Sequence, residues 1–156
     1  MSPSPGEETR IAGTEAAEEI APMHALCFPA SPWPEASFRE MLAIPGTFAV
    51  MAPGGFLLLR MSEEEAEILS MGVSPARRRQ GTGRRLVEKA LAFMAGKGVV
   101  SVFLEVSEHN APAFKLYKGA GFTKIGERKN YYTKQGAGEN AILMKICIVQ
   151  KKNQSL

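Results

Sequence analysis

The sequence has 156 residues, of which 45% are hydrophobic and 22% are charged, which fits one compact domain and excludes a disordered, collagen-like or coiled-coil chain. The formal net charge is +3, and all 16 acidic residues are Glu, so an EF-hand loop and a catalytic triad built on Asp are excluded. Two cysteines without a CxxC pair and two histidines predict no metal site.

Two helices are predicted in the first part of the chain. Residues 14–27 place apolar side chains at helical spacing, with Thr14 as the expected N-cap. The proline-rich stretch that follows contains Trp33 and predicts a stiff loop, and residues 35–43 predict a short second helix.

Three strands are expected next. Two apolar runs, at 47–52 and 56–61, are separated by Pro53, Gly54 and Gly55, a pattern typical of a β-hairpin. Residues 65–73 continue as a third strand. The first half of the sheet is therefore expected to be strongly antiparallel.

The second half of the chain alternates strands and helices. Its expected elements are a helix at 81–98 that ends at glycines, an apolar strand at 99–106, a helix at 110–121 and two closing strands at 122–132 and 140–149. The predicted order of elements is β-α-α-β-β-β-α-β-α-β-β, which is typical of an α/β layer structure. We expect residues 1–150 to form the domain and residues 151–156 to be a loose tail.

A basic, glycine-rich junction joins the strand at 65–73 to the helix at 81–98. The first N–H groups of a helix, together with the helix dipole, bind a pyrophosphate well, and Gly81 and Gly83 let phosphates approach the backbone closely. The pattern RxxGxG at residues 78–83 is neither a Walker A loop nor a dinucleotide-binding GxGxxG. It indicates a phosphate-bearing partner, which is either a cofactor or RNA.

This junction resembles the coenzyme-A loop of the GCN5-related N-acetyltransferases. Further along, LEVSEHNAPAFKLYKGAGF at 104–122 and RKNYY at 128–132 resemble the RimI type, which acetylates the N-terminal alanine of a small-subunit ribosomal protein. The similarity covers residues 30–148. It implies a mixed sheet of about six to seven strands with about four helices, splayed in the middle to hold acetyl-CoA as co-substrate.

The resemblance also implies a set of coenzyme-binding residues. The acetyl end of acetyl-CoA is expected to lie along the edge of the strand, where the Val73 amide binds the thioester carbonyl. Asn110, at the cap of the next helix, is expected to contact the coenzyme as well. The implied residues are Met71, Gly72, Val73, Arg79, Gln80, Gly81, Thr82, Gly83, Arg84 and Asn110.

Two catalytic residues follow from the resemblance. Glu105, at the end of the apolar strand, is implied to be the general base that takes the proton of the amine. Tyr117 is implied to be the general acid that protonates the departing thiolate. The residues alone favour a solvated strand end for Glu105 and a packing residue for Tyr117. His109 is a rival base in principle, but it is interpreted as a surface residue.

The substrate-binding residues implied by the resemblance are Trp33, Tyr131 and Tyr132, which would flank a peptide groove. All three could instead be packing residues. Thr133 stands where a proline often follows the tyrosine pair, and Glu139 and Asn140 replace a more acidic stretch, which leaves the peptide preference open.

Two alternatives remain beside acetylation of a protein N-terminus. The acceptor could be a small-molecule amine or a lysine side chain, or the cluster Arg77 to Arg85 could make the chain an RNA-binding module. The expected partner is the N-terminus of a ribosomal protein, with no membrane, no DNA and at most weak RNA contact. Cys27 and Cys147 are interpreted as small buried residues of a reduced protein, so a cytoplasmic location is expected.

Overall fold

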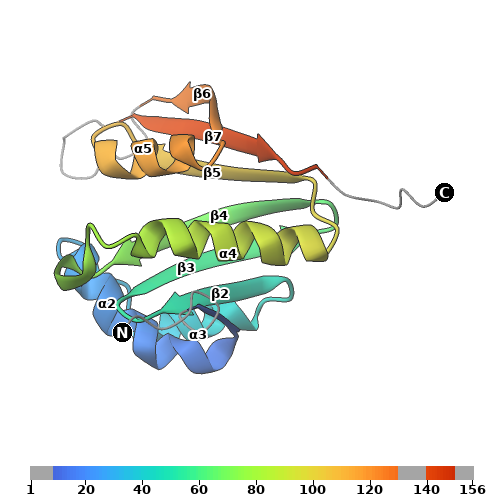
Figure 1. The fold of residues 1–156 in the computed structure, drawn as a ribbon. Helices are drawn as coiled ribbons and strands as arrows, with labels where there is room; N and C mark the ends of the chain where they lie inside the picture. The colour runs from blue at the N-terminus through green and yellow to red at the C-terminus, as the bar shows by residue number, and fades with distance from the viewer. Residues whose placement is uncertain (1–8, 130–139, 150–156) are drawn as a thin grey trace.

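The computed structural model describes residues 9–129 and 140–149. In chain order, the elements are β1 (Arg10–Ala12), the 3-10 helix η1 (Thr14–Ala16), α2 (Ala17–Cys27), α3 (Glu35–Ala43), β2 (Thr47–Ala52), β3 (Gly55–Ser62), β4 (Glu65–Val73), the 3-10 helix η2 (Pro75–Arg77), α4 (Thr82–Gly96), β5 (Ser101–Ser107), α5 (Ala111–Gly119), β6 (Thr123–Arg128) and β7 (Ala141–Cys147). The strands form one mixed seven-stranded sheet in the order β1-β2-β3-β4-β5-β7-β6 (Figure 1). The predicted α/β fold class is confirmed.

The antiparallel first half of the sheet is built as the sequence predicts. Ala52 pairs with Gly55, so β2 and β3 are joined by the two-residue turn of Pro53 and Gly54. Gly54 has a φ of +78°, a conformation that glycine adopts without steric cost. The hairpin predicted from these residues is confirmed.

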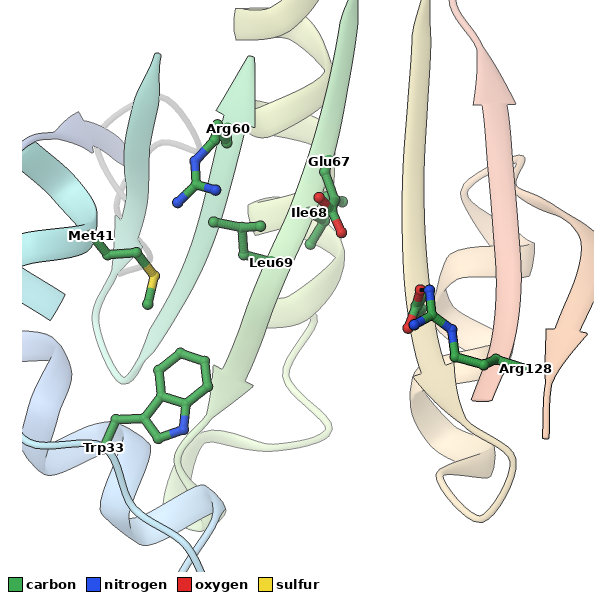
Figure 2. A pocket seen from close by; sticks show the side chains of 8 residues that line it. Trp33, Met41, Arg60, Glu67, Ile68, Leu69 and Arg128 are labelled. Atoms are coloured by element: carbon green, nitrogen blue, oxygen red, sulfur yellow. Dashed lines mark hydrogen bonds and ion pairs between the residues drawn. The ribbon is translucent and has the colours of Figure 1, made fainter. Parts of the chain in front are cut away.

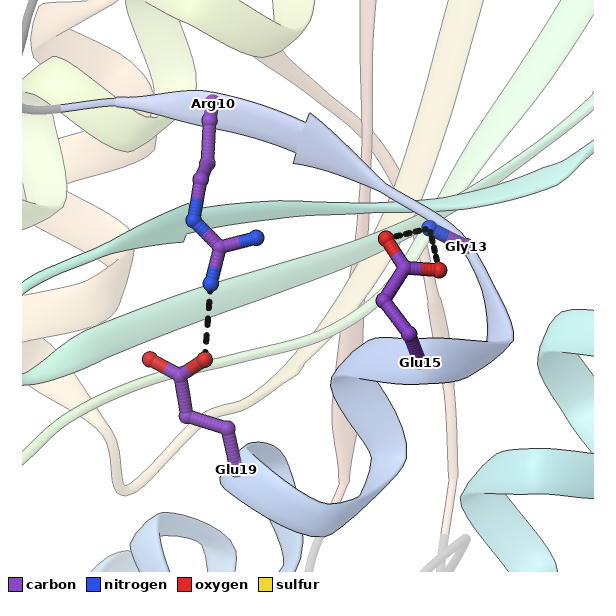
Figure 3. A network of polar contacts seen from close by, with 4 residues as sticks. All are labelled: Arg10, Gly13, Glu15 and Glu19. Atoms are coloured by element: carbon purple, nitrogen blue, oxygen red, sulfur yellow. Dashed lines mark hydrogen bonds and ion pairs between the residues drawn. The ribbon is translucent and has the colours of Figure 1, made fainter.

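The first described element is a strand, as the predicted order of elements has it, but the start of the first helix differs from the prediction. Residues Arg10–Ala12 form the short strand β1 on the edge of β2, and three residues are too few to show a strand pattern. Thr14 is not an N-cap, because it is the first residue of η1 and Gly13 holds the cap position. The carboxylate of Glu15 accepts a hydrogen bond from the Gly13 N–H at 3.2 Å (Figure 3). Arg10 Nη2 donates to Glu19 Oε1 at 2.7 Å, which ties β1 to α2.

Alternating side chains give the sheet two different buried faces. The α4 face packs against α4 and α5 and buries, among others, Leu57, Leu59, Ile68 and Leu104. The α3 face packs against α2 and α3 and includes Phe56. Burial of each large side chain contributes about 1.5–3 kcal/mol.

The parallel strands β4 and β5 pair over only a short distance. Glu65, Ala66 and Glu67 are paired with Ser101, Val102 and Phe103, and β5 pairs with β7 over its whole length. Residues 68–73 of β4 therefore have no neighbour in β5. We call this separation the fork, and it confirms the splayed sheet that the resemblance implied.

A β-bulge lies at the start of the fork. Ile68 pairs with Leu59 and Ser70 pairs with Leu58, so Leu69 is the extra residue on β4. Bulges bend a strand and redirect its side chains, and they are frequent beside active sites. The sequence pattern of this strand did not predict the bulge.

The last strands close the sheet in an order that the sequence did not predict. β7 is inserted between β5 and β6, and the described part of β6 ends at Arg128. Cys147, at the end of β7, is exposed, so the expectation that both cysteines are buried is wrong for it, and Cys27 is half-buried. Over the described residues, no helix has the length and apolar character needed to cross a membrane.

Candidate active site

A cavity of about 450 Å³ opens at the fork on the α3 face of the sheet (Figure 2). Its walls come from the loop before α3, from α3 itself, and from β3, β4, β5 and β6. The lining residues are Trp33, Met41, Arg60, Glu67, Ile68, Leu69, Glu105 and Arg128.

Glu105 enters this cavity because of the alternation along β5. Val102, Leu104 and Val106 are buried on the α4 face, which turns Glu105 to the opposite face. The Glu105 side chain keeps 22% of its surface exposed, and its Oε2 accepts a hydrogen bond from Arg128 Nη2 at 2.7 Å. A partly buried carboxylate held by a guanidinium has a fixed position. The structure thus brings Glu105 together with Trp33, while its role as base stays a prediction.

Trp33 forms the opposite wall and is positioned by His24. The Trp33 N–H donates to Nδ1 of His24 at 3.2 Å, and the two rings stack with centroids 4.9 Å apart. The His24 side chain is buried in an aromatic cluster, and this burial lowers the pKa of His24 below its ordinary value of 6.5. A neutral imidazole can accept this hydrogen bond, so His24 holds Trp33 in place, a contact that the sequence did not reveal.

The basic junction lies at the end of β4 and forms the N-terminus of α4. Gly81 is the N-cap, with a φ of +81°, and no side chain caps the first turn. Arg85 donates from Nη1 to the Gln80 carbonyl oxygen at 3.0 Å, and Arg78 Nε donates to the Val73 carbonyl oxygen at 2.9 Å. Arg85 is partly buried, and its side chain holds the loop.

Arg79 is the strained residue of this junction. It has a φ of +66°, which costs a residue with a Cβ atom about 1–2 kcal/mol. Its side chain is exposed, and in the described part of the chain it makes no hydrogen bond or ion pair. Uncapped N–H groups next to an unengaged guanidinium fit the pyrophosphate of a coenzyme.

Helix α5 places the other predicted residues. Asn110 Oδ1 accepts from the Ala113 N–H at 3.2 Å, which confirms Asn110 as the helix cap. Tyr117 is buried on the α4 face with its ring against Phe122, and burial raises the pKa of Tyr117. His109 is exposed, as expected.

The structure describes only some of the remaining residues predicted to bind coenzyme or substrate. Arg84 is exposed and pairs with Glu88 at 3.1 Å, one helical turn away. Tyr131 and Tyr132 lie outside the described residues. No finding tests the substrate role of this pair or the coenzyme contacts predicted for the junction.

Comparison with known proteins shows the family to which this chain belongs. Residues 17–122 match the model of the acetyltransferase (GNAT) family. The chain belongs to the GNAT family. This membership favours the enzyme over the RNA-binding module that the basic junction left open.

The sequences of related proteins indicate which type of GNAT enzyme this chain resembles. It is 39% identical over 115 residues to the N-alpha-acetyltransferase RimI of Mycobacterium tuberculosis, covering 68% of this chain and 71% of that one. It is 36% identical over 93 residues to the ribosomal protein bS18-alanine N-acetyltransferase of Escherichia coli, covering 60% and 63%. The resemblance to the RimI type is confirmed.

Solved structures support the GNAT fold. The crystal structure of the ribosomal-protein-S18-alanine N-acetyltransferase from Escherichia coli matches with a TM-score of 0.80 and 28% identity, covering 95% of this chain and 98% of that chain. NAA60 of Arabidopsis thaliana, in complex with acetyl-CoA, matches with a TM-score of 0.74 and 20% identity, covering 90% and 97%. The second likeness concerns the fold alone.

Three residues that line the cavity at the fork were not predicted from the sequence as site residues. Glu67 alternates with the buried Ala66 and Ile68, a signal that places it on the α3 face. Arg128 opens the RKNYY motif but was given no role. Arg60 has no local pattern to mark it.

Replacing Arg79 with glycine is expected to raise the free energy of unfolding by roughly 1 kcal/mol, because glycine adopts a positive φ without a Cβ clash. The same change is expected to weaken acetyl-CoA binding by about tenfold, because a charged contact is lost. Urea unfolding and calorimetric titration measure the two effects. Glu63 also has a positive φ, of 60°, in the turn before β4, so Glu63→Gly is the matched control that should gain stability alone. Unchanged coenzyme affinity in Arg79→Gly would remove Arg79 from the site.

His24 is expected to make stability depend on pH near neutrality. Its folded-state pKa lies below the unfolded value of 6.5, so the unfolded state binds more protons and stability falls as the pH drops through this range. Between pH 7.5 and 6.0, the melting temperature of the wild type should fall more than that of His24→Gln. His109→Gln, the control at the exposed histidine, should behave as the wild type. Parallel curves for all three proteins would contradict the assignment.

Proposed function

We propose that this chain transfers the acetyl group of acetyl-CoA to the N-terminal α-amine, on alanine, of a small-subunit ribosomal protein. The observation that carries the proposal is the fork between β4 and β5, in a sheet that has Glu105 on its α3 face and Tyr117 on its α4 face. An amine that approaches from one face and a thiolate that leaves on the other need a base and an acid on opposite sides. The named activities of the two relatives support the choice of substrate.

The chain's own residues divide the work as follows. Glu105 takes the proton from an α-amine whose ordinary pKa is about 7.7–8.0, so a carboxylate near neutral pH suffices. Tyr117 holds a proton on the coenzyme side. Acetyl-CoA supplies the acetyl group as a thioester. The residues proposed to hold it are Met71, Gly72 and Val73 on β4, the loop Arg79 to Arg84, and Asn110.

The substrate peptide is proposed to bind in the cavity at the fork. Trp33 provides one wall, and Tyr131 and Tyr132 remain part of the proposal as further contacts. A ribosomal substrate places the reaction in the cytoplasm.

Acetylation of matched peptides tests the proposed substrate. A peptide with a free N-terminal alanine and one internal lysine should be acetylated at the α-amine alone, as located by mass spectrometry. The same peptide with its N-terminus blocked should not react. Equal reaction of the blocked peptide would make lysine the acceptor. Steep, salt-dependent binding of RNA that acetyl-CoA does not affect would favour the RNA-binding alternative.

A further inference from the structure

Glu67 brings a second carboxylate into the cavity that contains Glu105. It is the last residue of β4 that pairs with β5, where it lies opposite Phe103. Glu105 is two residues further along β5, and alternation turns both glutamates to the α3 face. Glu67 and Glu105 therefore line the same cavity from the two sides of the fork, where Figure 2 shows Glu67 on β4.

The charged side chains of the cavity differ in whether they form hydrogen bonds or ion pairs. Glu105 Oε2 is held by Arg128 at 2.7 Å. Arg60 is the direct cross-strand partner of Glu67, yet its Nε donates to Thr47 Oγ1 at 3.0 Å. In the described part of the chain, the Glu67 carboxylate makes no hydrogen bond or ion pair. The negative charge open to an incoming ligand is therefore at Glu67.

We infer that Glu67 is a positioning residue that receives the α-ammonium group of the substrate at the mouth of the fork. The inference rests on the proposed function. At neutral pH an α-amine with a pKa of about 7.7–8.0 is largely protonated, so the substrate arrives as a cation. Two guanidiniums in the cavity repel that cation, and a carboxylate with open acceptors binds it through charge-assisted hydrogen bonds.

The geometry gives the two glutamates different tasks. Glu67 holds the ammonium in the cavity that Leu69 and Trp33 also line, and it forms no covalent bond. The proton then passes from the ammonium nitrogen to Glu105, whose carboxylate is fixed by Arg128. Loss of Glu67 should therefore weaken substrate binding, whereas loss of Glu105 should slow the reaction.

Steady-state kinetics of Glu67→Gln tests this division. The substrate is a peptide with a free N-terminal alanine and no other cationic group, so that only the α-ammonium can interact. At pH 7.0 the KM for the peptide should rise about tenfold, with kcat within about threefold of the wild type. Glu64→Gln is the matched control, because Glu64 is exposed in the turn before β4 and does not line the cavity. It should leave both constants unchanged.

The pH dependence separates ammonium binding from a structural effect. At pH 9 most of the peptide is neutral, so the ratio of KM between Glu67→Gln and the wild type should shrink toward one. Glu67→Asp, which keeps the charge, should restore part of the affinity. An unchanged KM at pH 7.0, or a KM ratio that is the same at both pH values, would overturn the inference.

The failure of this inference can be told apart from the failure of the proposed function. If the wild type does not acetylate the peptide, the proposed substrate is wrong. If the wild type acetylates it and Glu67→Gln does so with the same KM, only the role of Glu67 is wrong. Equal stabilisation of both proteins by acetyl-CoA shows that the variant is folded.

Discussion

Replacing Glu105 with glutamine is expected to lower turnover by about 100-fold or more, with acetyl-CoA affinity unchanged. Glutamine has nearly the same shape but cannot accept the proton of the amine. The side chain lies on the α3 face, away from the basic junction at the start of α4, so coenzyme binding should not depend on it. The measurement is turnover with a peptide substrate together with the dissociation constant of acetyl-CoA, on the same protein.

The ion pair with Arg128 needs its own control. Glu105→Gln also weakens the 2.7 Å contact to Arg128, so a loss of turnover could come from a displaced guanidinium. Arg128→Gln weakens the same contact but keeps the carboxylate. If Glu105 is the general base, Arg128→Gln should lose much less turnover than Glu105→Gln. Equal losses, or Glu105→Gln activity equal to the wild type at every pH, would contradict the assignment of Glu105 as base.

Local patterns predicted the parts of the site that one element builds alone. The apolar run at 99–106 predicts the strand, and the period of two along a strand places Glu105 on the same face as Phe103, in agreement with the observed burial of alternate residues. The glycines of the junction predict the backbone at the start of α4, and Asn110 predicts the cap of α5. Each of these depends on residues within a few positions of each other.

Contacts between distant elements were not predictable in this way. Arg128 meets Glu105 although β7 lies between their strands, and nothing in the sequence of β6 states that order. His24 lies among apolar residues of the first predicted helix, yet its Nδ1 accepts a hydrogen bond from the backbone N–H of Trp33 in the following loop. The bulge at Leu69 is a register shift between two strands, and the sequence pattern of either strand alone does not predict it.

Replacing Tyr117 with phenylalanine is expected to lower turnover by about tenfold, with acetyl-CoA affinity nearly unchanged. The change removes only the hydroxyl, and the ring can keep its edge-to-face contact with Phe122, whose centroid is 5.7 Å away. The hydroxyl makes no hydrogen bond within the described residues, so its loss should not leave a buried partner unsatisfied there. Turnover and coenzyme affinity should be measured on the same preparation.

The raised pKa of Tyr117 bears on this prediction in two ways. Burial keeps the hydroxyl protonated across the whole working range of pH, so the acid form is always present. The same shift makes it a weaker acid, and a thiol leaving group with a pKa near 8.5 needs less protonation than an alkoxide would. The effect should therefore be smaller than that of Glu105→Gln. A packing tyrosine would lose almost nothing, so turnover within about twofold of the wild type would remove the acid role from Tyr117.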